Sequence, residues 1–142
     1  MIWNKPLTLQ QLNQFCDNSA ISHLGIQFSA KGDDWLEAQL TVDERSCQPM
    51  GYLHGGISAT LAETVGSLAG FCCVSDEHFV VGTEINASHL RPVKKGTTVT
   101  ARATPARLGK STQVWLINLY DEQLQLCCTA RLTLAVVNKQ GK

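Results

Sequence analysis

The sequence predicts an α+β fold in which one long central helix is wrapped by an antiparallel sheet of five or six strands. The first observation is an apolar run over residues 56–74 whose single charged residue is Glu63. A segment that is apolar on every face is typical of a buried helix. The second is that residues 79–137 form successive strand-like segments joined by short polar turns. One sheet covers only one side of such a helix, so we also expect the chain to form homo-oligomers.

Length and composition restrict the class of protein. The chain has 142 residues, which predicts a single domain spanning residues 1–142. Its 12 Lys and Arg balance its 12 Asp and Glu, so we expect no general attraction to nucleic acid or to anionic membranes. The first six residues lack the pattern of a secretory signal. The hydroxyl, glycine and carboxylate side chains inside residues 56–74 argue against a membrane span. We therefore expect a cytoplasmic protein.

The cysteines indicate neither a metal site nor disulfide bonds. They form two adjacent pairs and two single residues: Cys16, Cys47, Cys72, Cys73, Cys127 and Cys128. This spacing matches no zinc motif and no redox pair. Free thiols in a reducing compartment are the expected state.

The N-terminal part of the chain is expected to hold one short helix and two strands. Thr8 can cap a helix that ends before residue 19, because apolar side chains recur at helical spacing after it. Residues 23–26 are expected to lead directly into a strand at 26–30. Residues 35–42 alternate between apolar and polar side chains, which is typical of a strand with one buried face.

The second half of the chain is expected to contain only strands. Threonine, valine and other strand-favouring residues are frequent there, and turns rich in glycine, proline and charged residues separate them. In the third of these strands, Trp115, Ile117 and Leu119 share one face. The expected strands are residues 79–87, 97–106, 112–120 and 124–137.

The stretch from residue 48 to Glu63 is the candidate functional site. Gly55 and Gly56 stand where the long helix begins, and the first N–H groups of a helix lack helical partners. Such a helix start can hold an anion. A lone carboxylate in a buried helix is costly unless it is paired or used. The pattern therefore predicts a buried acid about two turns from an anion-binding helix start.

The motif Gln48…His54-Gly55-Gly56…Glu63…Ser67 resembles that of the hotdog-fold acyl-CoA thioesterases of the phenylacetate and 4-hydroxybenzoyl-CoA type. Other stretches resemble two related branches, the 1,4-dihydroxy-2-naphthoyl-CoA thioesterases of menaquinone synthesis and the proofreading thioesterases of enterobactin synthesis. These stretches are residues 1–3, 48–49, 53–56, 61–63, 80–82, 84–87, 108–109 and 121–122. The resemblance covers nearly the whole chain. It implies the hotdog fold and the hydrolysis of aryl or medium-chain acyl-CoA thioesters, or alternatively of acyl or aryl carrier-protein thioesters.

The resemblance also implies roles for the motif residues. Gly55 would supply the N–H that stabilises the oxyanion, and Gln48 and His54 would help to hold the thioester carbonyl. Glu63 would be the catalytic carboxylate, as general base or as nucleophile through a mixed anhydride. Ser67 lies four residues after Glu63 and could orient it. In this family the site lies between two subunits of a homodimer, which can pair into a homotetramer.

Coenzyme A carries phosphates, so a local basic site is expected although the net charge is zero. Arginine suits phosphate through paired hydrogen bonds. No separate cofactor is expected, because coenzyme A is part of the substrate. The resemblance implies contacts with coenzyme A from Gly82, His89, Leu90, Arg91, Pro92, Ala106, Arg107, Leu108, Gly109, Lys110 and Ser111.

Other interpretations remain open for these residues. Glu63 could be a structural acid paired with an arginine or a hydroxyl, and His54 could only bond the turn backbone. A hotdog dehydratase is disfavoured because the helix has no histidine beyond its first turn. A non-catalytic acyl-CoA sensor is disfavoured because a binding protein has no reason to bury Glu63.

The size of the acyl group is expected to be set just after Glu63. Small side chains at Gly66, Ser67 and Gly70 would leave room for a flat ring, and Leu68 would limit its size. Alternatively, Leu68 faces the sheet and only packs.

Overall fold

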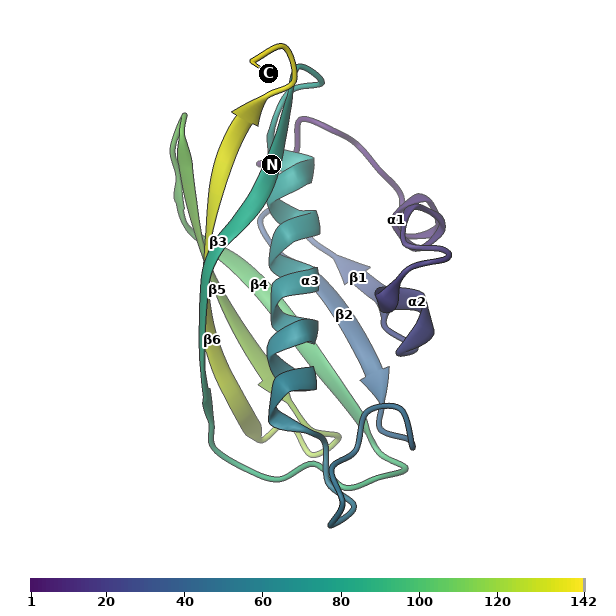
Figure 1. Ribbon diagram of the computed structural model, residues 1–142. Coiled ribbons are helices and arrows are strands. Elements are labelled where there is room, and N and C mark those ends of the chain that lie inside the picture. The colour runs from purple at the N-terminus through teal and green to yellow at the C-terminus, as the bar shows by residue number, and fades with distance from the viewer. Residues whose placement is uncertain (142) are drawn as a thin grey trace.

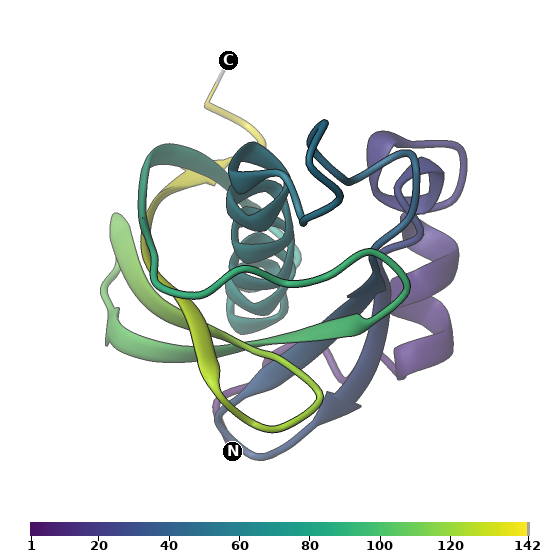
Figure 2. The ribbon, with the colours of Figure 1, turned by 90° about the horizontal axis from the view of Figure 1, so that it is seen from below.

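A six-stranded antiparallel sheet curves around one long helix in the computed structural model, which describes residues 1–141 (Figures 1 and 2). The strand order is β1-β2-β4-β5-β6-β3. This is the hotdog fold that the resemblance implies. The elements are α1 (Leu9–Phe15), α2 (Ala20–His23), β1 (Gln27–Lys31), β2 (Leu36–Thr41), α3 (Gly55–Cys73), β3 (His78–His89), β4 (Thr98–Leu108), β5 (Thr112–Tyr120) and β6 (Leu126–Asn138).

The sheet presents its apolar face to α3. In β5, Trp115, Ile117 and Leu119 lie on one face, as predicted, and this face is the fully buried one. The side of α3 that faces the sheet carries Leu61, Ala62, Val65, Leu68, Ala69 and Cys72. Hydrophobic burial between these two surfaces is the main force that holds the helix across the sheet.

Two glycines let α3 approach the sheet closely. A Cβ atom at Gly66 would lie 2.7 Å from Leu132, and one at Gly70 would lie closer still to Leu134. Leu68 is 8% exposed and belongs to the same core. The expectation that Gly66 and Gly70 leave room for an acyl ring is therefore wrong, because the strands already fill the space beside them.

One side of α3 is not covered by the sheet, as expected for a helix against a single sheet, and burial on every face would require a second chain. The uncovered side carries Gly56, Thr60, Glu63 and Ser67, which we call the α3 stripe. These positions recur every three or four residues, so they lie above one another on the helix surface. By length and hydropathy alone α3 could cross a membrane, but more than half of its most apolar window is buried inside the protein.

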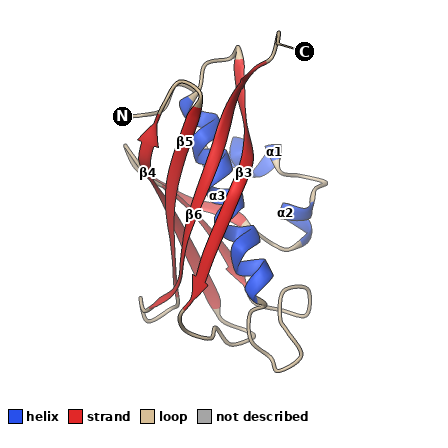
Figure 3. Ribbon diagram, turned by 60° about the vertical axis from the view of Figure 1, so that its left-hand side comes forward, coloured by secondary structure: helices blue, strands red, loops and turns tan. Residues whose placement is uncertain are grey.

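β3 lies at one edge of the sheet and pairs along its length with β6 only (Figure 3). The pairing register shifts between Gly82 and Glu84, so the strand bulges there. The outer edge of this 12-residue strand keeps its backbone hydrogen-bonding groups available. An exposed edge of this length is a template for pairing with another chain.

The N-terminal region contains one helix that the sequence did not predict. Residues 20–23 form α2 instead of leading straight into a strand. Ser19 accepts a hydrogen bond from the Ile21 N–H at 3.2 Å, and Ser22 closes the reciprocal capping contact. Capping boxes usually carry Glu or Gln at the position of Ser22, and a single helical turn has no periodicity to reveal it.

A buried lysine ties the N-terminal segment to the end of α3. The Lys5 ammonium donates hydrogen bonds to the carbonyls of Phe71, Val74 and Ser75. These carbonyls stand at and just after the end of α3, where carbonyls are left over from the helical ladder. The Phe71 and Ser75 carbonyls also accept backbone N–H groups, from Val74 at 3.4 Å and His78 at 3.1 Å. Burial lowers the pKa of Lys5 from its ordinary value. The contact fixes the far end of the helix that carries Gly55 and Glu63.

Candidate active site

The first turn of α3 leaves one N–H group without an acceptor. His54 caps the helix, and its Nδ1 accepts a hydrogen bond from the Gly56 N–H at 2.9 Å. The His54 carbonyl accepts from the N–H groups of Ile57 and Ser58 at 2.9 and 3.1 Å. Within residues 1–141 the Gly55 N–H has no acceptor. Both glycines stand at the helix start, but only the Gly55 N–H is free for a ligand, because the Gly56 N–H is occupied by His54.

The same cap fixes what His54 can offer a substrate. A neutral imidazole whose Nδ1 accepts a hydrogen bond carries its proton on Nε2. His54 therefore bonds the turn backbone, as one interpretation held, and still presents an Nε2–H donor. The side chain is exposed, so this donor is open to a ligand.

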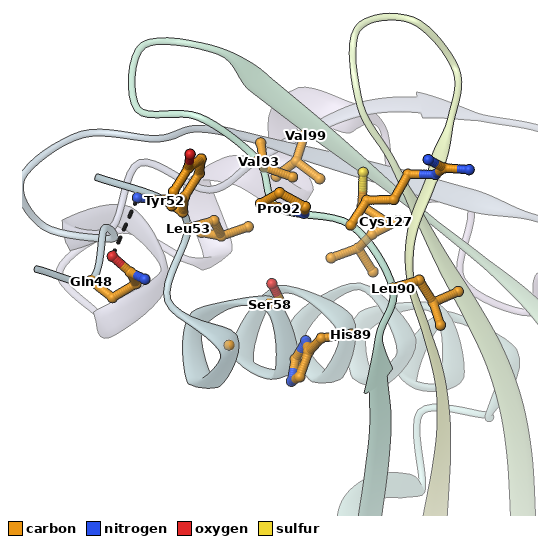
Figure 4. A pocket seen from close by; sticks show the side chains of 13 residues that line it. Gln48, Tyr52, Leu53, Ser58, His89, Leu90, Pro92, Val93, Val99 and Cys127 are labelled. Atoms are coloured by element: carbon orange, nitrogen blue, oxygen red, sulfur yellow. Dashed lines mark hydrogen bonds between the residues drawn. The ribbon is translucent and has the colours of Figure 1, made fainter. Parts of the chain in front are cut away.

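Gln48 is held in a tight turn before the helix. Its backbone N–H donates to the Tyr52 carbonyl at 2.7 Å. Its side-chain Oε1 accepts from the Met50 N–H at 2.5 Å. It also accepts from the Tyr52 N–H at 3.5 Å (Figure 4). The amide nitrogen has no acceptor among the residues the structure describes. Gln48 thus offers a second side-chain N–H donor near the helix start.

A cavity of about 420 Å³ opens beside the Gly55 N–H (Figure 4). Gln48 and His89 stand on its rim, while Val99 and Leu119 on its inner wall are fully buried. The His89 ring lies against Gly55, since a Cβ atom there would be 3.0 Å from His89 Nε2. The lining residues are Gln48, Tyr52, Leu53, Gly55, Ser58, His89, Leu90, Arg91, Pro92, Val93, Val99, Leu119 and Cys127.

Glu63 does not reach this cavity in the single chain. It comes eight residues after Gly55, which is about 12 Å along the helix axis. Its side chain is exposed on the α3 stripe, and no hydrogen bond or ion pair to it occurs within the described part of the chain. The single chain leaves Glu63 exposed, so the predicted burial of this acid, and the argument against a sensor that relies on it, require a second chain to cover Glu63. Among the described residues, no arginine or hydroxyl pairs with Glu63 as a structural acid would require.

Gly82 lies beside the Glu63 carboxylate and is not among the residues that line the cavity. A Cβ atom at Gly82 would be 2.5 Å from Glu63 Oε1. Ser67 is partly buried on the α3 stripe, and its hydroxyl makes no hydrogen bond to Glu63. The predicted contact of Gly82 with coenzyme A and the predicted orienting role of Ser67 stay predictions.

The two basic segments implied to bind coenzyme A lie at opposite ends of α3. Residues 89–92 line the cavity at its first turn. Residues 106–111 form the tip of the β4–β5 hairpin, and three of them line a second cavity of about 400 Å³ with Val74, where the helix ends (Figure 1). One chain alone does not bring the two segments together.

The described residues contain no cluster of metal ligands, and burial raises the pKa of most of their thiols. Within residues 1–141 no group of three His, Cys, Asp or Glu side chains could hold a metal ion. The six cysteines are unpaired, and burial raises the pKa of Cys73 to about 12. Burial also raises the pKa of Cys127 in the cavity wall, so this thiol is a poor nucleophile at neutral pH.

The chain is similar to known proteins over nearly its whole length. Residues 50–128 match the family described as the thioesterase superfamily. A protein of Pasteurella multocida named a presumptive esterase is 62% identical over 140 residues, covering 99% of this chain and 100% of that protein. A thioesterase structure from Haemophilus influenzae is 57% identical with a TM-score of 0.96, covering 99% of this chain and 97% of the other. A variant thioesterase from Pseudomonas aeruginosa is 44% identical with a TM-score of 0.94, covering 97% and 99%.

Proposed function

The chain belongs to the thioesterase superfamily and is a thioester hydrolase, and from this premise we propose that it hydrolyses acyl-CoA thioesters with aryl or medium-chain acyl groups. The observation that carries the proposal is the unpaired N–H of Gly55 at the mouth of a largely apolar cavity. Its volume lies in the range of small-molecule sites. An aryl group such as 1,4-dihydroxy-2-naphthoyl is a candidate occupant.

The donors at the helix start are arranged for an oxyanion. Attack on a thioester carbonyl moves negative charge onto its oxygen, and fixed donors that meet this charge lower the barrier. The Gly55 N–H, the His54 Nε2–H and the Gln48 amide all belong to the helix start and the turn before it, and none of them has an acceptor among the described residues. The N-terminal dipole of α3 adds favourable potential for the same charge.

We propose that Glu63 of a second copy completes the site. Within one chain Glu63 and Gly55 are about 12 Å apart along the helix axis, so their reactive groups do not meet at the same thioester. Glu63 belongs to the α3 stripe and lies beside Gly82 of β3. The α3 stripe and the free edge of β3 together provide a surface for a second chain. A homodimer in which each Glu63 faces the other chain's Gln48 and His54 supplies every group, and two such dimers can form a tetramer.

In this arrangement Glu63 acts on the carbonyl carbon from the side opposite the oxyanion donors. As general base it takes a proton from water, whose oxygen bonds to the carbonyl carbon. The intermediate then breaks the carbon–sulfur bond, and the proton passes to the departing thiolate. As nucleophile Glu63 forms a mixed anhydride that water cleaves in a second step. Both routes release free coenzyme A and a carboxylic acid, and we place the reaction in the cytoplasm.

A second candidate substrate is an acyl or aryl carrier-protein thioester. Leu90 lines the cavity and is 53% exposed, and Met50, two residues after the cavity-lining Gln48, is 79% exposed. A carrier domain that docks at the cavity would approach these side chains. A carrier-protein substrate presents an apolar protein surface to these residues, which free coenzyme A does not.

Thiol release tests the proposed function. The protein should release free thiol from benzoyl-CoA in steady state, measured with a colorimetric thiol reagent. Benzoyl-CoA and a benzoyl carrier protein should be compared at equal concentrations, because the larger kcat/KM identifies the preferred carrier. Release no faster than in buffer from either substrate would contradict the proposal.

A further inference from the structure

Among the hydroxyls of α3 in the described chain, that of Ser58 is buried and yet has no hydrogen-bond partner. The Ser67 hydroxyl also lacks a partner, but Ser67 is partly exposed on the α3 stripe. Ser58 is 6% exposed, and its hydroxyl has no hydrogen-bond partner within residues 1–141. The hydroxyls of Thr60 and Thr64 on the same helix donate to the carbonyls one turn earlier, at 2.9 and 2.7 Å. In the described chain, every fully buried side-chain nitrogen or oxygen has a hydrogen-bond partner. The Ser58 oxygen has none, so it is not fully buried, and the cavity that Ser58 lines is where it is accessible.

The wall around this hydroxyl is apolar. Val93, Val99 and Leu119 are at most 4% exposed and line the cavity with Ser58 (Figure 4). The Cys127 thiol, which also lines the cavity, already donates to the Gln125 carbonyl at 3.3 Å. A hydroxyl that faces an apolar cavity without a partner loses hydrogen-bonding free energy that a polar ligand group can restore.

The shape of the cavity also indicates which part of the substrate it holds. The inner wall consists of fully buried residues such as Val99 and Leu119, which close the cavity beyond Ser58. The pantetheine arm must continue to a charged nucleotide, so it needs an exit. The exposed side chain of Arg91 stands on the rim, where a phosphate can remain in solvent. The acyl group needs no exit, so it fits the closed end of the cavity.

We propose that the acyl group occupies this cavity and that Ser58 is a specificity-determining residue, which hydrogen-bonds a polar oxygen substituent on that group. Ser58 follows Gly55 by three residues, about 4.5 Å along the axis. The substituent it contacts is therefore close to the thioester carbon. The inference rests on the proposed function and identifies the acyl class as oxygen-substituted.

The test compares four substrates: benzoyl-CoA and 2-, 3- and 4-hydroxybenzoyl-CoA. The wild-type protein should prefer at least one hydroxybenzoyl-CoA over benzoyl-CoA. Ser58→Ala should lower kcat/KM for that substrate by about 2- to 13-fold, the worth of one neutral hydrogen bond. It should leave benzoyl-CoA unchanged or improved. Ser58→Thr keeps the hydroxyl and should keep the preference.

The matched control is Thr64→Val, which removes a hydroxyl that already has a partner on the same helix. It should leave the substrate ratios unchanged. Equal loss on all four substrates in Ser58→Ala, or no hydroxyl preference in the wild type, would overturn the inference while the proposed function stands. Absence of hydrolysis of every acyl-CoA by the wild type would instead reject the proposed function. Thermal unfolding confirms that each variant is folded.

Discussion

The carboxylate of Glu63 lies over the backbone of Gly82 on β3, so close that a Cβ atom at Gly82 would be 2.5 Å from Glu63 Oε1. Glycine at this position lets the carboxylate rest on the strand next to its bulge. The strand therefore sets the position of the proposed catalytic group, although it supplies no side chain to the reaction.

Gly82→Ala should displace the carboxylate. We expect kcat to fall by about 10- to 100-fold, because a misplacement near 1 Å can cost about that much. The melting temperature should change little, since the Glu63 side chain is exposed and can move aside. Steady-state kinetics and thermal unfolding measure the two effects. An unchanged kcat would show that the resting position of the carboxylate is unimportant.

Glu63→Gln should abolish most hydrolysis and leave the fold intact. The loss of a general base typically costs about 10²–10⁴-fold in rate. The control is Glu84→Gln, which removes a carboxylate from an exposed position on β3 near the bulge. Only the first variant should lose activity. Similar turnover in both folded variants would remove Glu63 from the mechanism.

Leu68→Ala should reduce stability without changing substrate preference. Leu68 packs in the core between α3 and the sheet, so truncation should lower the free energy of unfolding by about 2–5 kcal/mol. Ratios of kcat/KM for acetyl-, hexanoyl- and benzoyl-CoA should match those of the wild type. A shift toward bulkier acyl groups would restore the interpretation that Leu68 limits acyl size.

The chain order of the elements and the helix start were predictable because they depend on local signals. Glycines after His54 mark the beginning of a helix, and alternation marks strands such as β5. β6 begins at Leu126 rather than at residue 124, because Leu124 adopts a φ of 61° in the preceding turn. A pattern of residue types does not reveal such a backbone conformation.

The surroundings of single residues on α3 were harder to predict. Gly66 and Gly70 suggested empty space, but glycine in a helix equally permits close contact with a sheet. Glu63 appeared buried because its neighbours in sequence are apolar, although its position faces away from the sheet. Ser58 gave no signal, since its free hydroxyl differs from that of Thr60 only in three dimensions.

Mixing two inactive variants tests the central claim, that each site combines Glu63 of one chain with Gly55, His54 and Gln48 of another. Glu63→Ala and Gln48→Ala subunits are purified, unfolded together in equal amounts and refolded. Half of the dimers should be mixed, and each mixed dimer has one intact site of two, so about a quarter of wild-type activity should return. Activity no higher than the mean of the two variants refolded separately would show that each site is built within one chain and would contradict the account.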